Sequence, residues 1–348
     1  MIRPTTIILA AILLLGPLLV AELGVRALID TGRLPSAPSS SDFADVSLAN
    51  ARRLGQPNVL LVGASTVRNA LKPATLERLI EDETGLEVHV QGVAQGGVSM
   101  ATQLLLVRAL AEDGLLPQTV IIGVSPVSLV GGFPPEGDWL ARSELGRQWS
   151  GCTSDGLAPL SLDCALGRVS ALWRWRGRAE QVTQALGAGM PTTFTDRGRT
   201  LKPDGWVATR PSTGERLIEQ LPRALERMDE DVVVPSDVVE GFAQLVEYLR
   251  EQDVDVVALR MPYWSQLETA LVERNPEWAS QRDAGYEQLS AAADIELLDA
   301  DAFEAVAEVR WFRDPRHLSR VGAGPYTRSL WADPDFRGPI LESLASAD

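Results

Sequence analysis

The feature that most constrains the fold is a series of short apolar runs, rich in β-branched residues, that alternate with stretches of helical periodicity. Three such runs, at 58–63, 86–93 and 119–125, are predicted to be strands. Between them, 73–84 and 100–113 carry apolar residues at spacings of three and four, which predicts helices. Strands that alternate with helices form parallel sheets covered on both faces. We therefore expect a three-layer α/β/α protein.

The same alternation returns in the last third of the chain. An amphipathic pattern over 237–252 predicts a helix, and the apolar runs at 254–262 and 295–300 predict two further strands. Helices are also expected around 281–293 and after Gly322. These elements extend the same sheet and its covering layers.

Residues 130–236 lack this alternation and are rich in Gly, Pro and Trp. A structureless loop of that length is implausible inside a compact domain, so the segment should have structure of its own. We predict one α/β domain over 51–335, with 130–236 as an insertion after the third strand. The sequence assigns no role to this insertion.

The amino-terminal residues differ in character from the rest. The segment 5–29 holds a long run without charged side chains and approaches the roughly 20 apolar residues that a membrane-spanning helix needs. Arg3 precedes this run as in a signal peptide, but no small-x-small cleavage site is evident around Ala21. We predict that 1–30 is an uncleaved membrane anchor, with a cleaved signal peptide as the alternative. Residues 31–50 are expected to be a linker.

Charge restricts the class of partner. The formal net charge of -15 argues against a general affinity for the phosphate backbone of nucleic acid. We therefore expect no nucleic-acid partner.

The two cysteines, Cys152 and Cys164, are 12 positions apart, a spacing that suits a small disulfide loop in an oxidising compartment. Two unrelated buried thiols are the alternative. No histidine accompanies them in a metal-ligand grouping, so we predict no metal and no other cofactor.

The chain has only two histidines, so any serine–histidine mechanism has to use His89 or His317. His89 lies in a predicted strand, where a core or paired imidazole is the ordinary expectation. His317 lies in a polar loop, three positions after Asp314. An Asp at this distance can accept a hydrogen bond from the far ring nitrogen and fix the tautomer that a general base needs. This spacing is common by chance, and it gains weight only beside a nucleophile.

Ser65 is the candidate nucleophile. It follows the first predicted strand, where the chain has to turn into a helix, so its hydroxyl is expected at the carboxyl edge of the sheet. Val67 occupies the place of the second glycine of the G-x-S-x-G elbow, which argues against an α/β-hydrolase. Ser99 also follows a strand, but it ranks lower because Gly96 and Gly97 suit a loop that binds an oxyanion.

Four short blocks occur in the order found in one enzyme superfamily. They are GAS at 63–65, a glycine pair at 96–97, IIGVSP at 121–126 and DPRH at 314–317. In these blocks the chain resembles the SGNH (GDSL) hydrolase superfamily, and the resemblance extends over 57–130 and 237–332.

The resemblance implies a flavodoxin-like parallel sheet and a role for each matching residue. Ser65 would be the nucleophile, His317 the base and Asp314 its orienting carboxylate. The backbone N–H groups of Ser65 and Gly96 would bind the oxyanion of the tetrahedral intermediate.

One departure from the family concerns Ser125. At this place the family usually has an Asn whose side chain completes the oxyanion hole. Either the Ser125 hydroxyl donates instead or the hole is weaker, and losing one such donor typically costs about a hundredfold or more in rate. Arg68 would face the site from the first helical turn and could pair with an anionic substrate, although such an arginine is more often solvated or structural.

The resemblance extends to extracytoplasmic SGNH-like proteins that move acyl groups on cell-surface polymers, such as those of alginate O-acetylation. It implies a serine esterase or O-acyltransferase that is anchored in the membrane, faces the outside of the cytoplasm and acts on acyl esters of a carbohydrate. A membrane protein that supplies acyl groups is a further expected partner, which the sequence does not identify. The alternative is a weak or inactive SGNH-like module that binds or assembles envelope polysaccharide. A cytoplasm-facing anchored protein remains a third interpretation, because the charges that flank the segment are ambiguous.

Overall fold

A computed structural model describes residues 4–30, 44–130, 170–175, 182, 194–196, 199–226, 228, 231–299 and 308–346. The chain divides into two compact units. The larger unit combines Asp42–Glu136 with Thr193–Asp348, and the smaller combines Met1–Ser41 with Gly137–Thr192. The expected insertion is thus divided between them.

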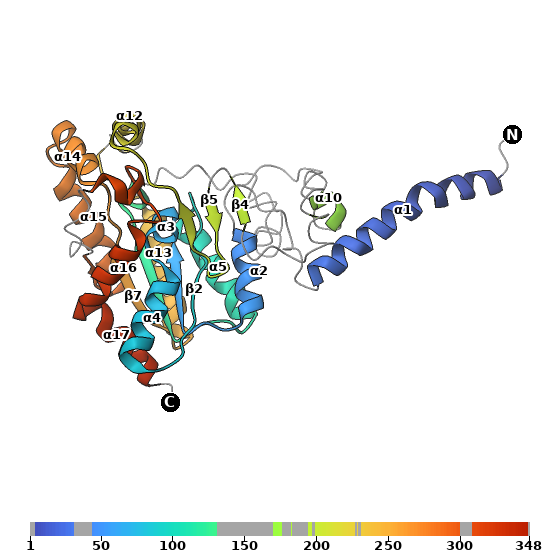
Figure 1. The fold of residues 1–348 in the computed structure, drawn as a ribbon, viewed down its shortest axis with the longest axis horizontal. Coiled ribbons are helices and arrows are strands. Elements are labelled where there is room, and N and C mark those ends of the chain that lie inside the picture. The colour runs from blue at the N-terminus through green and yellow to red at the C-terminus, as the bar shows by residue number, and fades with distance from the viewer. Residues whose placement is uncertain are drawn as a thin grey trace. The chain divides into compact units, whose positions relative to one another are not determined.

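The centre of the larger unit is a five-stranded parallel sheet with the strand order β2-β1-β3-β7-β8 (Figure 1). Its strands are β1 (Val59–Gly63), β2 (Val90–Gly92), β3 (Thr119–Val124), β7 (Asp255–Arg260) and β8 (Leu297–Leu298). Each of these strands lies within a run that the sequence predicted to be a strand. The expected α/β class, the parallel sheet and an insertion after β3 are confirmed.

Helices cover both faces of this sheet (Figure 1). One layer holds α5 (Met100–Glu112), α13 (Ser236–Glu251) and α15 (Trp278–Ala293), which pack side by side. The opposite layer holds α4 (Pro73–Thr84), α16 (Ala323–Ala332) and α17 (Pro334–Ala345). The short α6 (Pro126–Leu129) follows β3 and contacts α15. The bounds of α4, α5, α13 and α15 agree with the periodicity seen in the sequence.

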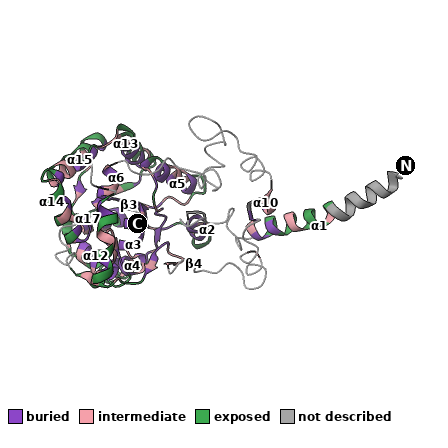
Figure 2. Ribbon diagram, turned by 90° about the horizontal axis from the view of Figure 1, so that it is seen from above, coloured by how far each residue is buried: buried purple, intermediate pink, exposed green. Residues whose placement is uncertain are grey.

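The core follows the alternation of side chains along each strand. Val59 and Leu61 of β1 belong to the cluster that includes Ile340 of α17 and Tyr326 of α16. Leu60, which points the opposite way, is also fully buried because α5 and α13 cover that face. Figure 2 shows the sheet as a buried centre with the exposed positions on the outer sides of the helices. Because both faces of the sheet are buried, the strands do not alternate between apolar and polar residues.

Two glycines allow the helix after β1 to lie close to the sheet. This helix is α3 (Ser65–Ala70), and its Val67 side chain contacts both Gly63 and Gly123. A Cβ atom at either glycine would overlap Val67 Cγ2. Gly63 also has a φ of +150°, which other residues rarely adopt. Gly63, which ends the first predicted strand, and Gly123, which lies near the end of the third, are thus required by close packing.

The described part of the insertion in the larger unit continues onto the sheet edge. It forms the antiparallel strands β4 (Phe194–Asp196), β5 (Arg199–Leu201) and β6 (Val207–Thr209), followed by α12 (Gly214–Leu225). The β5–β6 turn meets edge strand β2, where Gly92 N–H donates to Asp204 O at 2.7 Å. Gly205, with a φ of +80°, approaches the Gly92 backbone so closely that no Cβ atom fits. The turn therefore covers the edge of β2, which would otherwise be exposed.

The segment that precedes α16 is a small hairpin. The 3-10 turn η3 (Val309–Trp311) leads into β9 (Phe312–Asp314), which pairs antiparallel with β10 (His317–Leu318). Phe312 and Leu318 are buried in the core, so the hairpin is fixed to the body of the larger unit.

Several elements differ from the expectation. α2 (Ala44–Leu54) begins inside the stretch expected to be a linker, and α17 lies mostly beyond the expected domain end at 335. The helix α14 (Ser265–Arg274) was not predicted either. α17 contains Pro339 and α12 contains Pro222, which obscure a helical pattern in the sequence.

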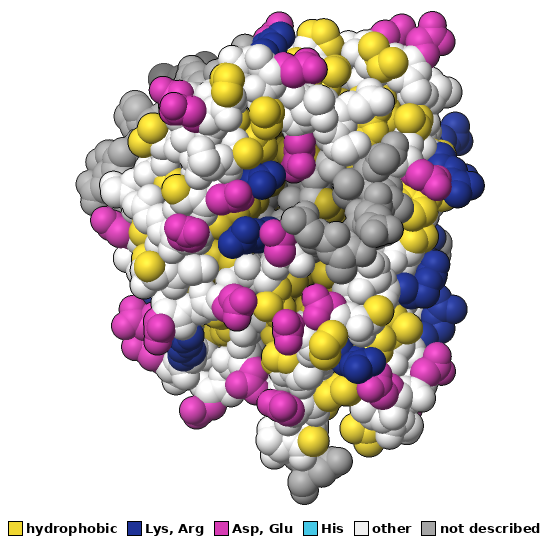
Figure 3. All heavy atoms as spheres, turned by 90° about the vertical axis from the view of Figure 1, so that its left-hand side faces the viewer, with side chains coloured by type: hydrophobic (Ala, Val, Ile, Leu, Met, Phe, Trp, Pro, Cys, Tyr) yellow, Lys and Arg dark blue, Asp and Glu magenta, His cyan; other side chains and the backbone are white. Residues whose placement is uncertain are grey.

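Charged side chains are spread over the surface of the larger unit. In the face shown in Figure 3, Asp and Glu stand at many separate positions, whereas several Lys and Arg gather along one edge of the view. The acidic excess of the sequence is thus distributed over this face and does not form one patch.

In the smaller unit, α1 (Pro4–Asp30) packs against α10 (Ala171–Trp175). Val25 and Leu28 of α1 are buried against Trp175. The Glu22 carboxylate accepts hydrogen bonds from Ser170 Oγ and from the first N–H groups of α10, each at 2.8 Å. Across the described residues, we find no helix with both the length and the apolar character that a membrane crossing requires.

Candidate active site

The carboxyl edge of the parallel sheet brings together residues that are far apart in sequence. β1 ends at Gly63, and Ser65 occupies the first position of α3. β3 ends at Val124 next to Ser125, and the chain after β7 passes through Tyr263. Since parallel strands present their carboxyl ends on one side, their following loops share this edge.

Ser65 meets the hairpin through a hydrogen bond to His317. Ser65 Oγ lies 2.8 Å from His317 Nε2, although the two residues are 252 positions apart. The other ring nitrogen, His317 Nδ1, lies 2.7 Å from Asp314 Oδ1. The His317 side chain is 13% exposed, so it can be reached from solvent while both of its nitrogens have partners. The structure thus brings together the three residues singled out in the sequence.

The hairpin geometry explains this arrangement. Asp314 and His317 are paired across the β9–β10 turn, so both side chains project from the same side of the ladder. The Arg316 N–H donates to Asp314 Oδ1 at 3.1 Å and fixes the carboxylate. The Trp264 N–H donates to Pro315 O at 3.0 Å and ties the turn to the loop after β7.

Asp314 is held in its ionised form. Burial acts to raise the pKa of its carboxyl group, but the neighbouring His317 and Arg313 outweigh burial and place the pKa well below its usual range. Arg313 Nε lies 3.6 Å from Asp314 Oδ2. An ionised Asp314 can accept from Nδ1–H, which leaves Nε2 with a lone pair toward Ser65.

Gly96 and Arg68 flank Ser65. A Cβ atom at Gly96 would lie 3.4 Å from Ser65 Cβ and 2.9 Å from Arg68 Nη2. Gly96 is therefore adjacent to the serine, as the sequence suggested, and a side chain at this position would displace the Arg68 guanidinium. Arg68 is 4% exposed, so its guanidinium lies within the protein beneath this loop.

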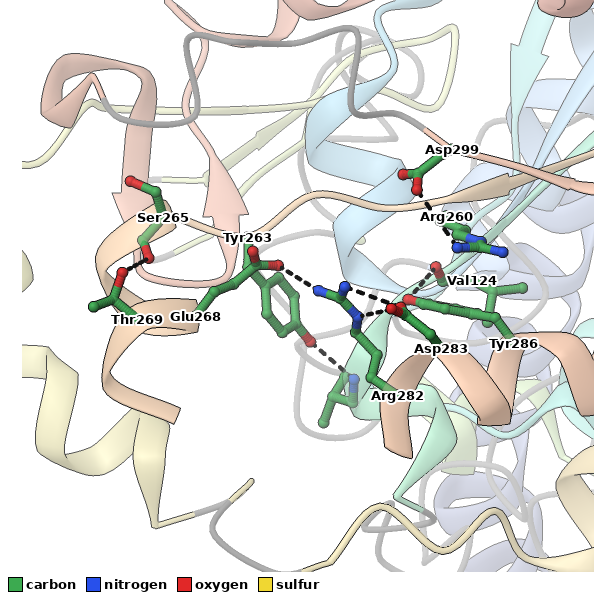
Figure 4. A network of polar contacts seen from close by, with 11 residues as sticks. Val124, Arg260, Tyr263, Ser265, Glu268, Thr269, Arg282, Asp283, Tyr286 and Asp299 are labelled. Atoms are coloured by element: carbon green, nitrogen blue, oxygen red, sulfur yellow. Dashed lines mark hydrogen bonds and ion pairs between the residues drawn. The ribbon is translucent and has the colours of Figure 1, made fainter. Parts of the chain in front are cut away.

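Ser125 lies inside the protein. It is fully buried, and its Oγ lies 3.1 Å from Ser128 Oγ. Beside it, the Tyr263 hydroxyl accepts from Val127 N–H at 3.0 Å (Figure 4). Burial raises the pKa of Tyr263 to about 12, so this hydroxyl stays protonated at neutral pH. The Tyr286 hydroxyl also donates to Val124 O, at the end of β3, at 3.5 Å (Figure 4).

The remaining candidates lie elsewhere or were not described. His89 precedes β2 and is hydrogen-bonded through its backbone to Asn58, which places it at the amino edge of the sheet. Ser99 caps α5 by accepting from Thr102 N–H at 3.3 Å. Cys152 and Cys164 fall outside the described residues. Among the described side chains, no group of three or more His, Cys, Asp or Glu is placed to hold a metal ion.

A cleft of about 450 Å³, which the sequence did not predict, borders Asp314. Arginines from β5, from α12 and its approach, and from the β9–β10 turn line this cleft. Two of them, Arg216 and Arg223, are seven positions apart and so lie on one helical face. That spacing was a signal in the sequence, but it becomes informative only when 214–225 is known to be helical.

Chemically, this arrangement combines a hydroxyl, an imidazole and an ionised carboxylate in one line of hydrogen bonds. Such a line can remove the proton from the hydroxyl as oxygen attacks a carbonyl carbon. The N–H groups in the first turn of a helix have no intrahelical partner, so those at Ser65 are suited to a developing negative charge.

Fold and geometry together define an α/β protein with a five-stranded parallel sheet and a Ser–His–Asp line at the carboxyl edge of that sheet. No protein-family model matches the chain, and no curated protein matches it in sequence. Similarity to known proteins therefore assigns no family.

Proposed function

We propose that this protein is a serine esterase or O-acyltransferase that works through an acyl-Ser65 intermediate. One observation carries the proposal: Ser65, His317 and Asp314 form a continuous hydrogen-bonded line with contacts of 2.8 and 2.7 Å. Residues 252 positions apart have no local reason to meet in this way. Such a line is the recognised requirement for activating a serine.

In the first half of the reaction, Ser65 Oγ attacks the ester carbonyl carbon while His317 Nε2 accepts its proton. Asp314 stabilises the imidazolium that forms. The C–O bond to the alcohol then breaks, and His317 returns the proton to the leaving oxygen. The acyl group remains on Ser65.

In the second half, water or a carbohydrate hydroxyl attacks the acyl-Ser65 carbonyl. His317 again accepts the proton and passes it to Ser65 Oγ as the C–O bond to the serine breaks. Hydrolysis and transfer differ only in the attacking oxygen, so the same residues serve either outcome.

The negative charge on the carbonyl oxygen needs donors. We assign this role to the N–H groups of Ser65 and Gly96, because Gly96 lies beside the serine and α3 begins there. Ser125 was expected as a third donor, and its hydroxyl is buried against Ser128. The proposed oxyanion hole therefore consists of backbone N–H donors.

We further propose that the protein is related to the SGNH superfamily and acts on acyl esters of a cell-envelope carbohydrate. The order of its four sequence blocks supports the first part. An extracytoplasmic, membrane-associated location is proposed from the apolar amino-terminal run and from Leu15, Leu18, Leu19, Val20 and Leu23 of α1, each more than half exposed.

The test is hydrolysis of 4-nitrophenyl acetate by the full chain, with active-site labelling by a fluorophosphonate. We expect Ser65→Ala to lower the hydrolysis rate by about a thousandfold or more and to abolish labelling. Ser280→Ala is the matched control, because Ser280 is exposed on α15 and its hydroxyl only donates to Glu277 O.

Folded protein that is neither labelled nor active would refute the proposal. The module that binds polysaccharide without catalysis would then be the better interpretation. Equal labelling of Ser65→Ala and the unaltered chain would show that a different serine reacts.

A further inference from the structure

The cleft beside Asp314 is built by the insertion and by the hairpin that carries His317. The Ser212 N–H donates to Phe312 O at 2.8 Å, and the Arg320 N–H donates to Thr209 O at 2.9 Å. These backbone contacts join the β6–α12 segment to β9 and to the chain just after β10. The cleft therefore has fixed walls and shares one wall with the proposed catalytic line.

The lining of the cleft is strongly basic. It includes six arginines and one acidic residue, Asp314, whose carboxylate is already bonded to His317. The arginines are Arg199, Arg210, Arg216, Arg223, Arg313 and Arg316. Asp and Glu exceed Lys and Arg by 47 to 32 in the chain, and Figure 3 shows acidic side chains scattered over one face of the larger unit. The six arginines are therefore a local concentration of positive charge in a chain with an acidic excess.

The arginines are close enough to repel one another. Burial lowers the pKa of Arg313, and the positive charges of Arg199 and Arg216 lower it further, while Asp314 acts in the opposite direction. Over the described part of the chain, no acidic side chain forms an ion pair with Arg210, Arg216, Arg223 or Arg316. The cleft thus has positive charge that the described protein groups do not balance.

Neutral polar atoms lie in the same cleft. Ser212 Oγ, which can donate to an anion, and Gln220 Oε1, which accepts, are shielded from solvent, and neither has a hydrogen-bond partner among the described residues. Buried polar atoms usually have partners, so unmet ones on a cleft wall suggest a bound ligand group.

We propose that this cleft binds a ligand group with two or more negative charges, either a phosphate or a pair of carboxylates, carried by the acyl donor or acceptor of the reaction. Guanidinium groups bind both through paired N–H···O contacts. The assignment of the ligand as a substrate rests on the proposed function, whereas the binding itself does not. The insertion then acts as the part of the protein that selects an anionic substrate.

The test measures direct binding by isothermal titration of the full chain at constant ionic strength. The probes are inorganic phosphate and malonate, with acetate as the single-charge comparison. We expect saturable binding of phosphate or malonate that is tighter than that of acetate. Phosphate binding without malonate binding assigns a phosphoryl group, and the reverse assigns paired carboxylates.

Arg216→Gln removes one guanidinium from an exposed position of α12, so the fold should tolerate it. We expect this variant to weaken the preferred anion about tenfold or more, the usual effect of losing a charged hydrogen bond. Arg223→Gln is a second variant on the same helical face. Arg78→Gln is the matched control, because Arg78 is exposed on α4 and does not line the cleft.

Ser65→Ala separates this inference from the proposed function. It should bind the anion as tightly as the unaltered chain and yet hydrolyse no ester. An active enzyme with no saturable anion binding would overturn the anion site alone. Binding that persists unchanged in both arginine variants would overturn it as well.

Discussion

Gly123→Ala gives the sharpest test of how the sheet positions Ser65. The added Cβ atom would overlap Val67 Cγ2 of α3 and would lie 2.7 Å from Met261 Sδ. Met261 is flexible and can move aside, but Val67 is fixed because both sides of α3 are packed. Extra methyl groups in a packed core cost about 1–3 kcal/mol, so we expect that loss in the free energy of unfolding.

In a Val67→Ala background, Gly123→Ala should cost almost nothing more. By itself, the Val67 change removes two buried methyl groups and should cost about 2 kcal/mol. If the two changes were independent, the double variant would lose about 3–5 kcal/mol. Because the new methyl group fills the space that Val67 leaves, we expect the double variant to lose only about 2 kcal/mol.

Gly63→Ala is the contrasting variant. Its Cβ atom would also meet the backbone oxygen of Gly123 at 2.8 Å, and its φ of +150° disfavours alanine. Val67→Ala relieves neither, so the double variant Gly63→Ala/Val67→Ala should remain strongly destabilised. Urea unfolding of the five variants measures these differences. Additive losses for Gly123→Ala and Val67→Ala would refute the packing argument.

Three further expectations concern single groups. The pKa of Asp314 is lowered in the folded state, so its carboxylate stabilises the fold above the unfolded pKa of about 4, and this contribution is lost as the pH falls below that value. In urea unfolding, the stability of the chain relative to Asp314→Asn should therefore decrease from pH 6 to pH 3. A difference that stays constant over this range would contradict the expectation. Ser125→Ala removes a buried hydroxyl that contacts Ser128, so we expect a loss of about 1 kcal/mol in stability and little change in ester hydrolysis, whereas a hundredfold fall in kcat would make Ser125 an oxyanion donor after all. Gly205→Ala should destabilise the chain by about 2 kcal/mol or more, because its Cβ atom would collide with the Gly92 backbone and its φ is positive, and an unchanged melting temperature would show that the turn lies elsewhere.

The parallel sheet could be predicted from sequence because its strands are buried on both faces. Continuous apolar runs such as 119–125 have no competing interpretation once helical patterns stand on either side. The line of Ser65, His317 and Asp314 was also predictable as a set of candidates, since the chain has only two histidines. The distances between these residues could not be predicted, because a contact across 252 positions depends on how the whole larger unit folds.

The cleft could not be predicted for a related reason. Its arginines come from separate segments, and each alone reads as an ordinary exposed side chain. Ser125 presents a different difficulty. Its sequence block shows that it follows the end of a strand, but not how deeply its side chain is buried. Tyr263 and Tyr286, which bond to the backbone of Val127 and Val124 close to it, come from segments more than a hundred residues away.

The contact between Ser65 and His317 also sets an order in time. During synthesis β1 and α3 leave the ribosome early, whereas the β9–β10 hairpin and the helices that hold it are made last. A nascent chain therefore lacks the contact between Ser65 and His317 for most of its synthesis. The hydrogen-bonded line forms only when the final helices pack on the sheet, so under the proposed function a truncated or half-folded chain would be inert toward esters.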